Sequence, residues 1–241
     1  MQDLREQFPD PETVGAIIVS AGASTRMRGV DKTLVDLGGM PLIARTIDVF
    51  EHTEAVGFVV LVVAQLDLNS IADLAREYEW KKVIHVRIGG LRRQDSVRLG
   101  LRALPECDWV VVHDGARPLV TSKIIENGIL AAVATGAATA AIPVVDTIKV
   151  VTDDGHVVKT LDRRSIASTQ TPQVFRRDLL QKAHDAMKQD VTDDSSMLES
   201  QGMPVEVFVG DRMNIKVTTP EDLIIAEALL FARVSGEMSD V

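Results

Sequence analysis

Cysteine is nearly absent from this sequence, since Cys107 is the single one among 241 residues. One thiol excludes an internal disulfide framework and is typical of a protein kept in a reducing compartment. Cys107 stands between a helical pattern and an apolar run. We therefore expect it to pack in the interior rather than to act as a nucleophile.

Positive charge is also scarce. The 26 lysines and arginines face 35 aspartates and glutamates, which gives a net charge of -9 and a pI near 5.1. This balance argues against a nucleic-acid-binding surface. A small anionic ligand stays compatible with it, because such a ligand needs only a local cluster of cations.

Long hydrophobic runs and a secretory leader are missing as well. The longest apolar run, "GFVVLVVA" at 57–64, has the length of a strand rather than of a bilayer-spanning helix. The first residues, "MQDLREQFPDPET", contain no apolar signal segment. We therefore predict a cytoplasmic protein with neither a membrane nor a nucleic-acid partner.

What the sequence does contain is a regular alternation of apolar runs and helical patterns. The apolar runs cover 14–21, 57–64, 82–88, 108–114 and 137–144, and the helical patterns cover 41–52, 68–80, 91–104 and 121–135. Near-continuous apolar strands are buried on both faces, as in a parallel sheet covered by helices. We predict an α/β fold with a doubly wound, mostly parallel Rossmann-like sheet, which binds ligands at the carboxyl ends of its strands.

After Val144 the pattern changes. Residues 145–161 alternate around Asp154-Gly155, a strong hairpin signal, and predict a projecting β-hairpin arm. Beyond it, 176–189, 194–202 and 219–234 predict helices, with a strand at 204–210. We predict a single domain over 1–241, with residues 1–13 as a flexible N-terminal extension.

The segment after the first strand, "SAGASTRM" at 20–27, gives up its large side chains. Ala21, Gly22 and Ala23 leave backbone amides uncovered, which suits an anion. Arg26 and Lys32 add positive charge nearby. The segment is neither a dinucleotide fingerprint nor a P-loop, so a small-residue turn with solvated arginines is the alternative.

Two later strands also end in informative segments. "GGLRRQDSVRLGL" follows the third strand, where Gly89-Gly90 permits unusual backbone angles and close approach. Ser96 lies in the first turns of the next helix. "VVHDGARP" ends the fourth strand and places Asp114 and Arg117 at the ligand edge of the sheet. His113 has no other histidine in metal-ligand spacing, so we expect a structural role for it.

Further polar residues follow, and we expect them at loop positions: Thr147, Lys149, Arg163, Thr171, Thr192, Asp193, Asn214 and Lys216. Singly, each is compatible with a solvated charge or a cap. Together, in an acidic protein, they suit a phosphate-rich ligand.

The sequence shows no credible Ser/His/Asp triad. A phosphate monoester that attacks the α-phosphate of a nucleotide needs no strong base, because its oxygen is already anionic. Such a reaction needs alignment of two anions and positive charge on the transition state.

These segments resemble the 2-C-methyl-D-erythritol 4-phosphate cytidylyltransferase family. "SAGASTRM", "GGLRRQDSV", "VVHDGARP", "DTIK", "LDR", "TPQVF", "TDDSS" and "NIKVTTPEDL" occur in the family's order across about residues 14–232. The resemblance implies transfer of CMP from CTP to methylerythritol phosphate in non-mevalonate isoprenoid synthesis. It also implies release of pyrophosphate and a requirement for a divalent metal, normally Mg²⁺.

On the nucleotide side, the resemblance implies that Arg26 and Lys32 hold the CTP phosphates. Ala21, Gly22 and Ala23 would present backbone to the nucleotide. Cytosine would be recognised by Gly90 and Ser96. The metal would be held mainly by the CTP phosphates, with Asp114 as a further candidate ligand.

On the acceptor side, Asp114 and Arg117 would lie at the sugar-phosphate and ribose end, and Lys216 would bridge the two anions. Methylerythritol phosphate would contact Thr147, Arg163, Thr171 and Thr192. The family's arm crosses into a partner subunit, so the resemblance also implies a homodimer through 145–161. Thr147 and Arg163 would then serve a neighbour's site.

The sequence departs from the family pattern in a few places. Ser24 stands where a second glycine is usual, "DKT" at 31–33 replaces Pro-Lys-Gln, and Gly115 replaces a commoner alanine. The stretch from Met27 to Lys32 is one residue shorter than expected. Two alternatives stay open: a ribitol 5-phosphate cytidylyltransferase with the same CTP loops, and a catalytically silent nucleotide-binding homologue.

Overall fold

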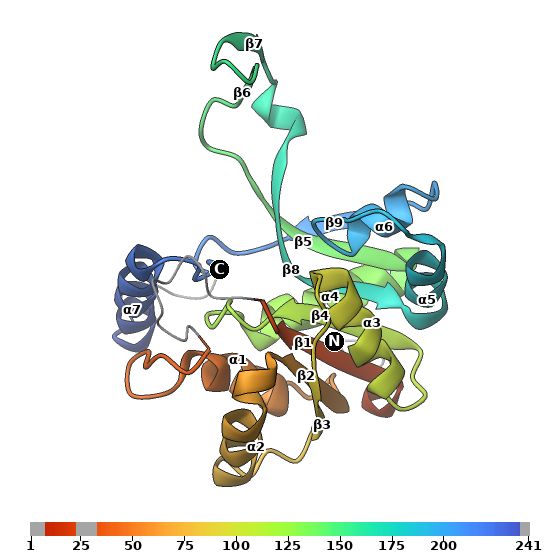
Figure 1. The fold of residues 1–241 in the computed structure, drawn as a ribbon, viewed down its shortest axis with the longest axis vertical. Helices are drawn as coiled ribbons and strands as arrows, with labels where there is room; N and C mark the ends of the chain where they lie inside the picture. The colour runs from red at the N-terminus through yellow and green to blue at the C-terminus, as the bar shows by residue number, and fades with distance from the viewer. Residues whose placement is uncertain (1–7, 23–32, 237–241) are drawn as a thin grey trace, which may run out of the picture.

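A seven-stranded sheet forms the centre of the computed structural model, which describes residues 8–22 and 33–236. Across the sheet the strands are β3 (Val83–Ile88), β2 (Phe58–Val63), β1 (Val14–Ser20), β4 (Trp109–Asp114), β8 (Ala167–Arg176), β5 (Ala137–Pro143) and β9 (Glu206–Val209). β8 runs antiparallel to both of its neighbours, and the other pairs are parallel. The predicted mostly parallel α/β sheet is confirmed (Figure 1).

Helices cover both faces of this sheet. One face packs against α1 (Leu42–His52), α2 (Leu68–Glu77) and α4 (Ser122–Thr135). The other packs against α3 (Arg93–Ala103), α5 (Arg177–Ala186) and α6 (Ser195–Glu199). Alternate residues of β1 divide between the two core layers, Ala16 and Ile18 in the first and Ile17 and Val19 in the second, as the period of two in a strand requires. The sheet is therefore doubly wound, as predicted.

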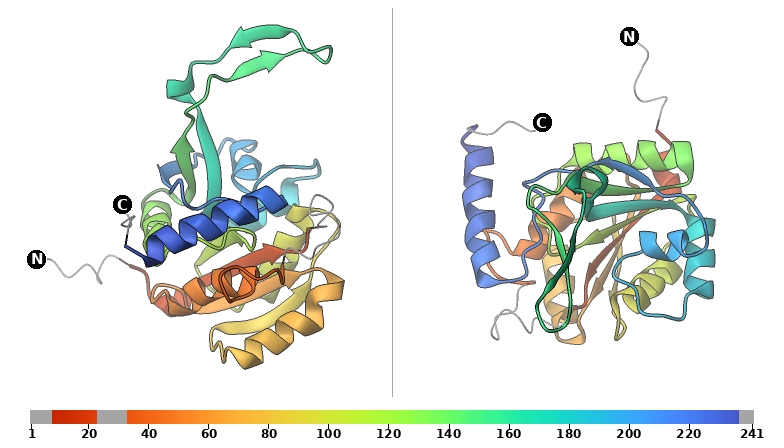
Figure 2. Two further views of the ribbon diagram at one scale, coloured as in Figure 1. Left: turned by 90° about the vertical axis from the view of Figure 1, so that its left-hand side faces the viewer. Right: turned by 90° about the horizontal axis from the view of Figure 1, so that it is seen from above.

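The last helix, α7 (Pro220–Val234), lies at the side of the molecule away from α5 (Figures 1 and 2). Thr219 and Asp222 form a capping box, and Pro220 occupies the first helical position. Ala226 of α7 packs in a small third core with Leu37, Leu42, Leu119 and Val217. No helix within 8–22 or 33–236 is long and apolar enough to cross a bilayer.

The arm is a separate two-stranded sheet. β6 (Lys149–Val151) and β7 (Val157–Thr160) pair antiparallel and stand well away from the main sheet (Figures 1 and 2). Gly155 adopts a φ of 85° in the turn, a conformation that suits glycine. Every residue of both strands is exposed. The predicted hairpin is confirmed.

β8 is the element that the sequence did not predict. The sequence predicts a loop position for Thr171, and this prediction is wrong because residues 167–176 form a ten-residue strand. The sequence does not reveal this strand because the segment is polar and contains Pro172. Proline is rare inside central strands. The two helices that follow β8 are shorter than predicted. They cover 177–186 and 195–199 instead of 176–189 and 194–202.

Residues 8–13 of the predicted N-terminal extension are described. Phe8 packs against the first core layer, and Pro11–Thr13 form a 3-10 turn. A Cβ at Gly57 would stand 2.3 Å from the carbonyl oxygen of Pro11. The glycine therefore gives this segment room to lie against the entry to β2.

Candidate active site

The strand order reverses between β1 and β4. From β1 the chain proceeds to β2 and β3 on one side, and β4 is added on the other side. In open α/β sheets this reversal opens a crevice at the carboxyl ends of the two strands. Ala21 and Gly22 directly follow β1, and Asp114 ends β4, so both predicted segments reach the crevice.

Two cavities adjoin at this edge. The first, here the β1 cleft, encloses about 440 Å³ and is lined by Ser20, Ala21, Gly22, Gly90, Arg92 and Ser96, among others. The second, here the β8 pocket, encloses about 430 Å³ and is lined by Thr139, Thr171, Gln173, Thr192, Asp193 and Ser195, among others. Arg93, Asp114 and Lys216 line both. These three side chains therefore form the boundary between the cavities.

Small residues shape the β1 cleft by allowing close packing. A Cβ at Gly89 would come within 2.2 Å of the Ala21 Cβ, and one at Gly90 within 2.5 Å of the Asp95 Cβ. Neither glycine has a positive φ, so the close approach is confirmed and the unusual backbone angle is not. The Ser96 hydroxyl accepts from the Gly90 amide at 3.1 Å and fixes this turn.

Asp114 is the centre of a cluster of charges. Its Oδ2 accepts from Lys216 Nζ at 2.7 Å and its Oδ1 from Arg93 Nε at 3.1 Å. Arg117 Nε lies 3.9 Å from Oδ2. Burial by itself would raise the pKa of Asp114, but the charges of Arg93, Lys216 and Arg117 outweigh it and hold the pKa well below its usual range. The carboxylate is therefore ionised at neutral pH.

The loop between β9 and α7, which carries Lys216, is tied to the sheet by several hydrogen bonds. Arg117 Nη1 donates to the Asn214 carbonyl at 2.7 Å, and Asn214 Nδ2 donates to the Thr171 carbonyl at 2.8 Å. The Thr171 hydroxyl accepts from the Asp114 amide at 3.0 Å. Arg117 and Thr171 thus hold Lys216 and Asp114 in fixed relation.

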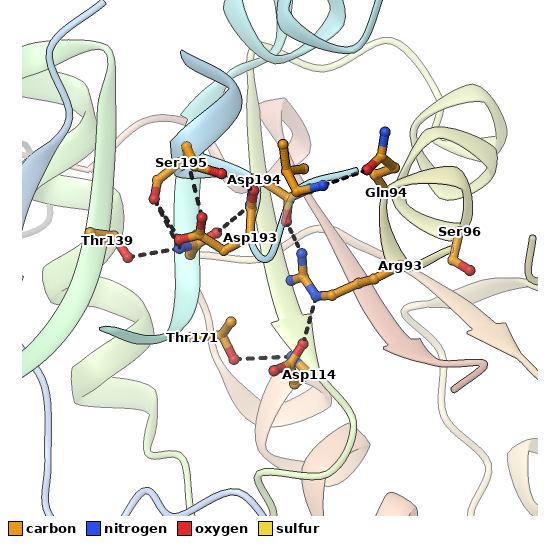
Figure 3. A network of polar contacts seen from close by, with 12 residues as sticks. Arg93, Gln94, Ser96, Asp114, Thr139, Thr171, Asp193, Asp194 and Ser195 are labelled. Carbon is orange, nitrogen blue, oxygen red and sulfur yellow. Dashed lines mark hydrogen bonds and ion pairs between the residues drawn. The ribbon is translucent and has the colours of Figure 1, made fainter. Parts of the chain in front are cut away.

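Buried polar groups line the β8 pocket, and Figure 3 shows their network of hydrogen bonds. Gln173, with no exposed surface, donates to Thr139 Oγ1 at 2.9 Å and to Asp193 Oδ2 at 2.8 Å. Asp193 also accepts from the Ser195 hydroxyl at 2.6 Å. Burial would raise the pKa of Asp193, but the hydrogen bonds from Ser195 and Gln173 lower it. The pocket therefore presents fixed donors and acceptors suited to a hydroxylated ligand.

Known proteins share both this sequence and this fold. A profile of the 2-C-methyl-D-erythritol 4-phosphate cytidylyltransferase family, IspD, matches residues 14–232. The chain belongs to that family. The enzyme of that name from Dehalococcoides mccartyi strain CBDB1 is 48% identical over 219 residues, which cover 91% of this chain and 96% of the relative. The one from Geobacillus thermodenitrificans is 44% identical, with 91% and 98% covered.

A solved structure agrees with the sequence relatives. The crystal structure of 4-diphosphocytidyl-2C-methyl-D-erythritol synthase from Anaerococcus prevotii DSM 20548 superposes with a TM-score of 0.81 at 31% identity. The match covers 92% of this chain and 100% of the chain in that crystal structure. The chain is thus a cytidylyltransferase, and its family favours methylerythritol phosphate over ribitol 5-phosphate as the acceptor.

Most of the residues that the sequence predicted for this cytidylyltransferase do gather at the two cavities. Ala21, Gly22, Gly90, Ser96, Asp114 and Lys216 line the β1 cleft. Asp114, Arg117, Thr171, Thr192 and Lys216 line the β8 pocket. Ala23, Arg26 and Lys32 lie outside the described residues.

Thr147 and Arg163 do not join them within one chain. Neither is among the described residues that line the two cavities. Both belong to the arm and its base, where Arg163 Nη1 donates to the Val145 carbonyl at 2.6 Å. Within this chain, Arg163 therefore contacts the base of the arm rather than the pocket.

Sequence reasoning missed Arg93, Gln173 and Asp194. Arg93 stands in the quoted segment "GGLRRQDSV", but nothing in two adjacent arginines says which one turns inward. Its neighbour Arg92 pairs with Asp95 at 2.9 Å instead. Gln173 and Asp194 stand in the quoted segments "TPQVF" and "TDDSS", but both are fully buried and pair with distant residues, so the sequence does not show that they belong to the site.

His113 and Cys107 are not among the described residues that line the two cavities. His113 is buried with its ring 5.2 Å from that of Phe50, and burial lowers its pKa to about 3. Cys107 is buried too, and burial raises the pKa of its thiol. Both arrangements fit the structural roles expected from the sequence.

Proposed function

We propose that CTP binds in the β1 cleft and methylerythritol phosphate in the β8 pocket. The acceptor phosphate then attacks the CTP α-phosphorus in line, giving CDP-methylerythritol and pyrophosphate. The observation that carries this assignment is the shared boundary of Arg93, Asp114 and Lys216. A cation common to both cavities is what two mutually repelling anions require for alignment.

On the CTP side, the small residues Ala21, Gly22 and Ala23 present bare backbone to the nucleotide. Gly90 and Ser96, joined by the hydrogen bond between them, contact the cytosine. Arg26 and Lys32 hold the phosphates and stabilise the charge that develops at the α-phosphorus. The positions of Arg26 and Lys32 in the family's order of motifs support these two roles.

On the acceptor side, Thr171, Thr192 and Asp114 bind the polyol phosphate, and Arg117 keeps the Lys216 loop in place. Lys216 contacts both anions at the boundary. No general base is needed because the attacking phosphate oxygen is already anionic. The ionised Asp114 acts by orienting Lys216 rather than by accepting a proton.

The arm completes the site from a second subunit in this proposal. Its strands expose Val150, Val151, Val157 and Val158, which is unfavourable for a hairpin standing alone in water. Thr147 and Arg163 lie away from the cavities of their own chain. A homodimer in which the arm crosses to its partner would cover the valines and bring Thr147 and Arg163 to the partner's acceptor pocket.

A divalent cation such as Mg²⁺ enters with CTP in this proposal. Among the described residues no group of three or more His, Cys, Asp or Glu side chains could hold it. Asp114, the earlier candidate, has Arg93 on one oxygen and Lys216 on the other. We therefore assign the ion to the nucleotide's phosphates, since Mg²⁺ keeps most of its waters and favours phosphate oxygens. Bound there, it would neutralise phosphate charge.

The first experiment is Mg²⁺-dependent pyrophosphate release from CTP, with methylerythritol phosphate and ribitol 5-phosphate assayed side by side. We expect turnover with methylerythritol phosphate and little with ribitol 5-phosphate. Preference for ribitol 5-phosphate would move the enzyme to another acceptor class. A folded protein that binds CTP and releases no pyrophosphate with either would favour the silent homologue. We also propose that the enzyme works in the cytoplasm, since a single cysteine is typical of a protein in a reducing compartment.

Arg26→Ala tests the role of the first loop. We expect this variant to lose most of its turnover, because positive charge at the α-phosphorus is removed, while the melting temperature stays near that of the wild type. Steady-state kinetics and thermal unfolding measure the two quantities. A wild-type kcat in Arg26→Ala would contradict the assignment.

A further inference from the structure

Arg93 lines both the β1 cleft and the β8 pocket. It begins α3, and its guanidinium lies between Asp114, at the end of β4, and Asp194, directly before α6 (Figure 3). Nε donates to Asp114 Oδ1 at 3.1 Å, and Nη1 donates to Asp194 Oδ2 at 2.6 Å. A planar guanidinium can hold two carboxylates at once, which an ammonium cannot do with the same geometry.

Asp194 fixes the guanidinium in place. Its side chain has no exposed surface, and Arg93 is the only cation hydrogen-bonded to it in the described part of the chain. His184 Nε2 is 3.8 Å from the other carboxylate oxygen, and burial lowers the pKa of that histidine, so it is neutral. A buried carboxylate needs a charged partner, and Arg93 therefore cannot turn away from it.

Asp114, by contrast, is shared. Lys216 approaches Oδ2 at 2.7 Å while Arg93 holds Oδ1. An ammonium that is held by a carboxylate is less available to a phosphate. Arg93 balances part of the charge of Asp114 from the opposite side, and this weakens the attraction between Asp114 and Lys216.

We infer that Arg93 is a positioning residue for Lys216. It keeps Asp114 in place with its charge balanced, so that the lysine can turn from the carboxylate to the substrate phosphates. This role rests on the proposed function, in which Lys216 contacts both anions. Through Asp194, Arg93 also anchors the segment that carries Thr192 to the same point, which fixes the spacing between the β1 cleft and the β8 pocket.

The test avoids leaving a buried carboxylate without a partner. Arg93→Gln is made in an Asp194→Asn background and compared with Asp194→Asn alone, both as full chains. We expect kcat to fall on the order of 10²-fold, the effect of misplacing a reacting group. The KM for CTP should change much less, and the melting temperatures of the two proteins should agree.

A second background separates positioning from a general structural effect. In Asp114→Asn/Asp194→Asn there is no carboxylate to retain Lys216, so adding Arg93→Gln should lower kcat by less than about twofold. Such non-additivity marks residues that act through one another. Arg98→Gln is the matched control. It lies on the same helix, pairs with Asp95 at 3.1 Å and lines neither cavity, so its kinetics should equal those of the wild type.

The outcomes distinguish the two levels of the proposal. A similar loss of kcat on adding Arg93→Gln in both backgrounds, or no loss in the Asp194→Asn background, would overturn the positioning role while the proposed function stands. A folded wild type that releases no pyrophosphate would overturn the proposed function and the positioning role together.

Discussion

At the scale of single residues, His113 shows how burial sets a charge state. Its ring has no exposed surface and packs on Phe50, so the folded protein keeps the imidazole neutral down to about pH 3. The unfolded chain protonates it near pH 6.5. Between these values the unfolded state binds a proton that the folded state does not, so the free energy of unfolding decreases as the pH falls.

This difference gives a pH-dependence prediction. We expect His113 to contribute a loss of about 1.4 kcal/mol for each pH unit below about 6.5, and His113→Gln to show a shallower decline than the wild type. Urea unfolding at pH 7.5, 6 and 5 measures it. His156→Gln is the control, since that side chain is 81% exposed. Parallel curves for wild type and His113→Gln would contradict the prediction.

Single residues also show what sequence can and cannot predict about the site. Asp114 could be placed because it ends an apolar run, and strand ends of a parallel sheet meet at one edge. Arg93 and Asp194 could not, because their pairing joins positions 101 residues apart. Their importance arises from a buried contact that leaves no periodic or compositional trace.

At the scale of elements, the fold was predictable where strands are buried on both faces. β1, β2 and β4 are near-continuous apolar runs and were found where expected. β8 was not, because its polar residues Gln170, Thr171 and Gln173 are buried against partners from other segments. A hydrophobic pattern cannot reveal a strand whose buried residues are polar and make hydrogen bonds.

α3 packs unusually close to the sheet at Gly100. A Cβ there would lie 2.5 Å from Ile17 Cγ2 and 3.1 Å from Val62 Cγ2. We expect Gly100→Ala to destabilise the protein by about 1–3 kcal/mol through overpacking, in spite of the roughly 1 kcal/mol gain in helix propensity.

Denaturant midpoints measure the effect of Gly100→Ala. Leu99→Ala, on the same helix at a residue that is 37% exposed, should shift the midpoint less. A Gly100→Ala variant more stable than the wild type would contradict this prediction. The helix could then shift on the sheet to make room for the methyl group at no cost.

At the scale of the whole molecule, the proposed dimer predicts complementation between two inactive subunits. Arg163→Ala removes the guanidinium that the arm would contribute and leaves Lys216 intact. Lys216→Ala removes the cation between the two cavities and leaves the arm intact. If Arg163 acts on the partner's pocket, mixed dimers regain one complete site. We expect neither variant to be active alone and the co-refolded mixture to recover a substantial part of wild-type turnover.

The mixture also discriminates against the simpler arrangement. If Arg163 acted within its own chain, every site in a mixed dimer would carry one defect, and mixing would restore nothing. Sedimentation velocity on the same samples verifies that dimers are present. A monomeric wild type with full activity would remove the need for a crossing arm.

The position of Lys216 in the chain has a consequence for protein synthesis. Asp114 and its strand are made in the first half of the chain, but the lysine that pairs with it at 2.7 Å comes 102 residues later. The loop that holds this lysine runs directly into the capping box of α7. If Lys216 acts as proposed, a nascent chain on the ribosome can build most of the sheet while its site is still incomplete, and cytidylyl transfer would begin only after the loop that carries Lys216 has emerged.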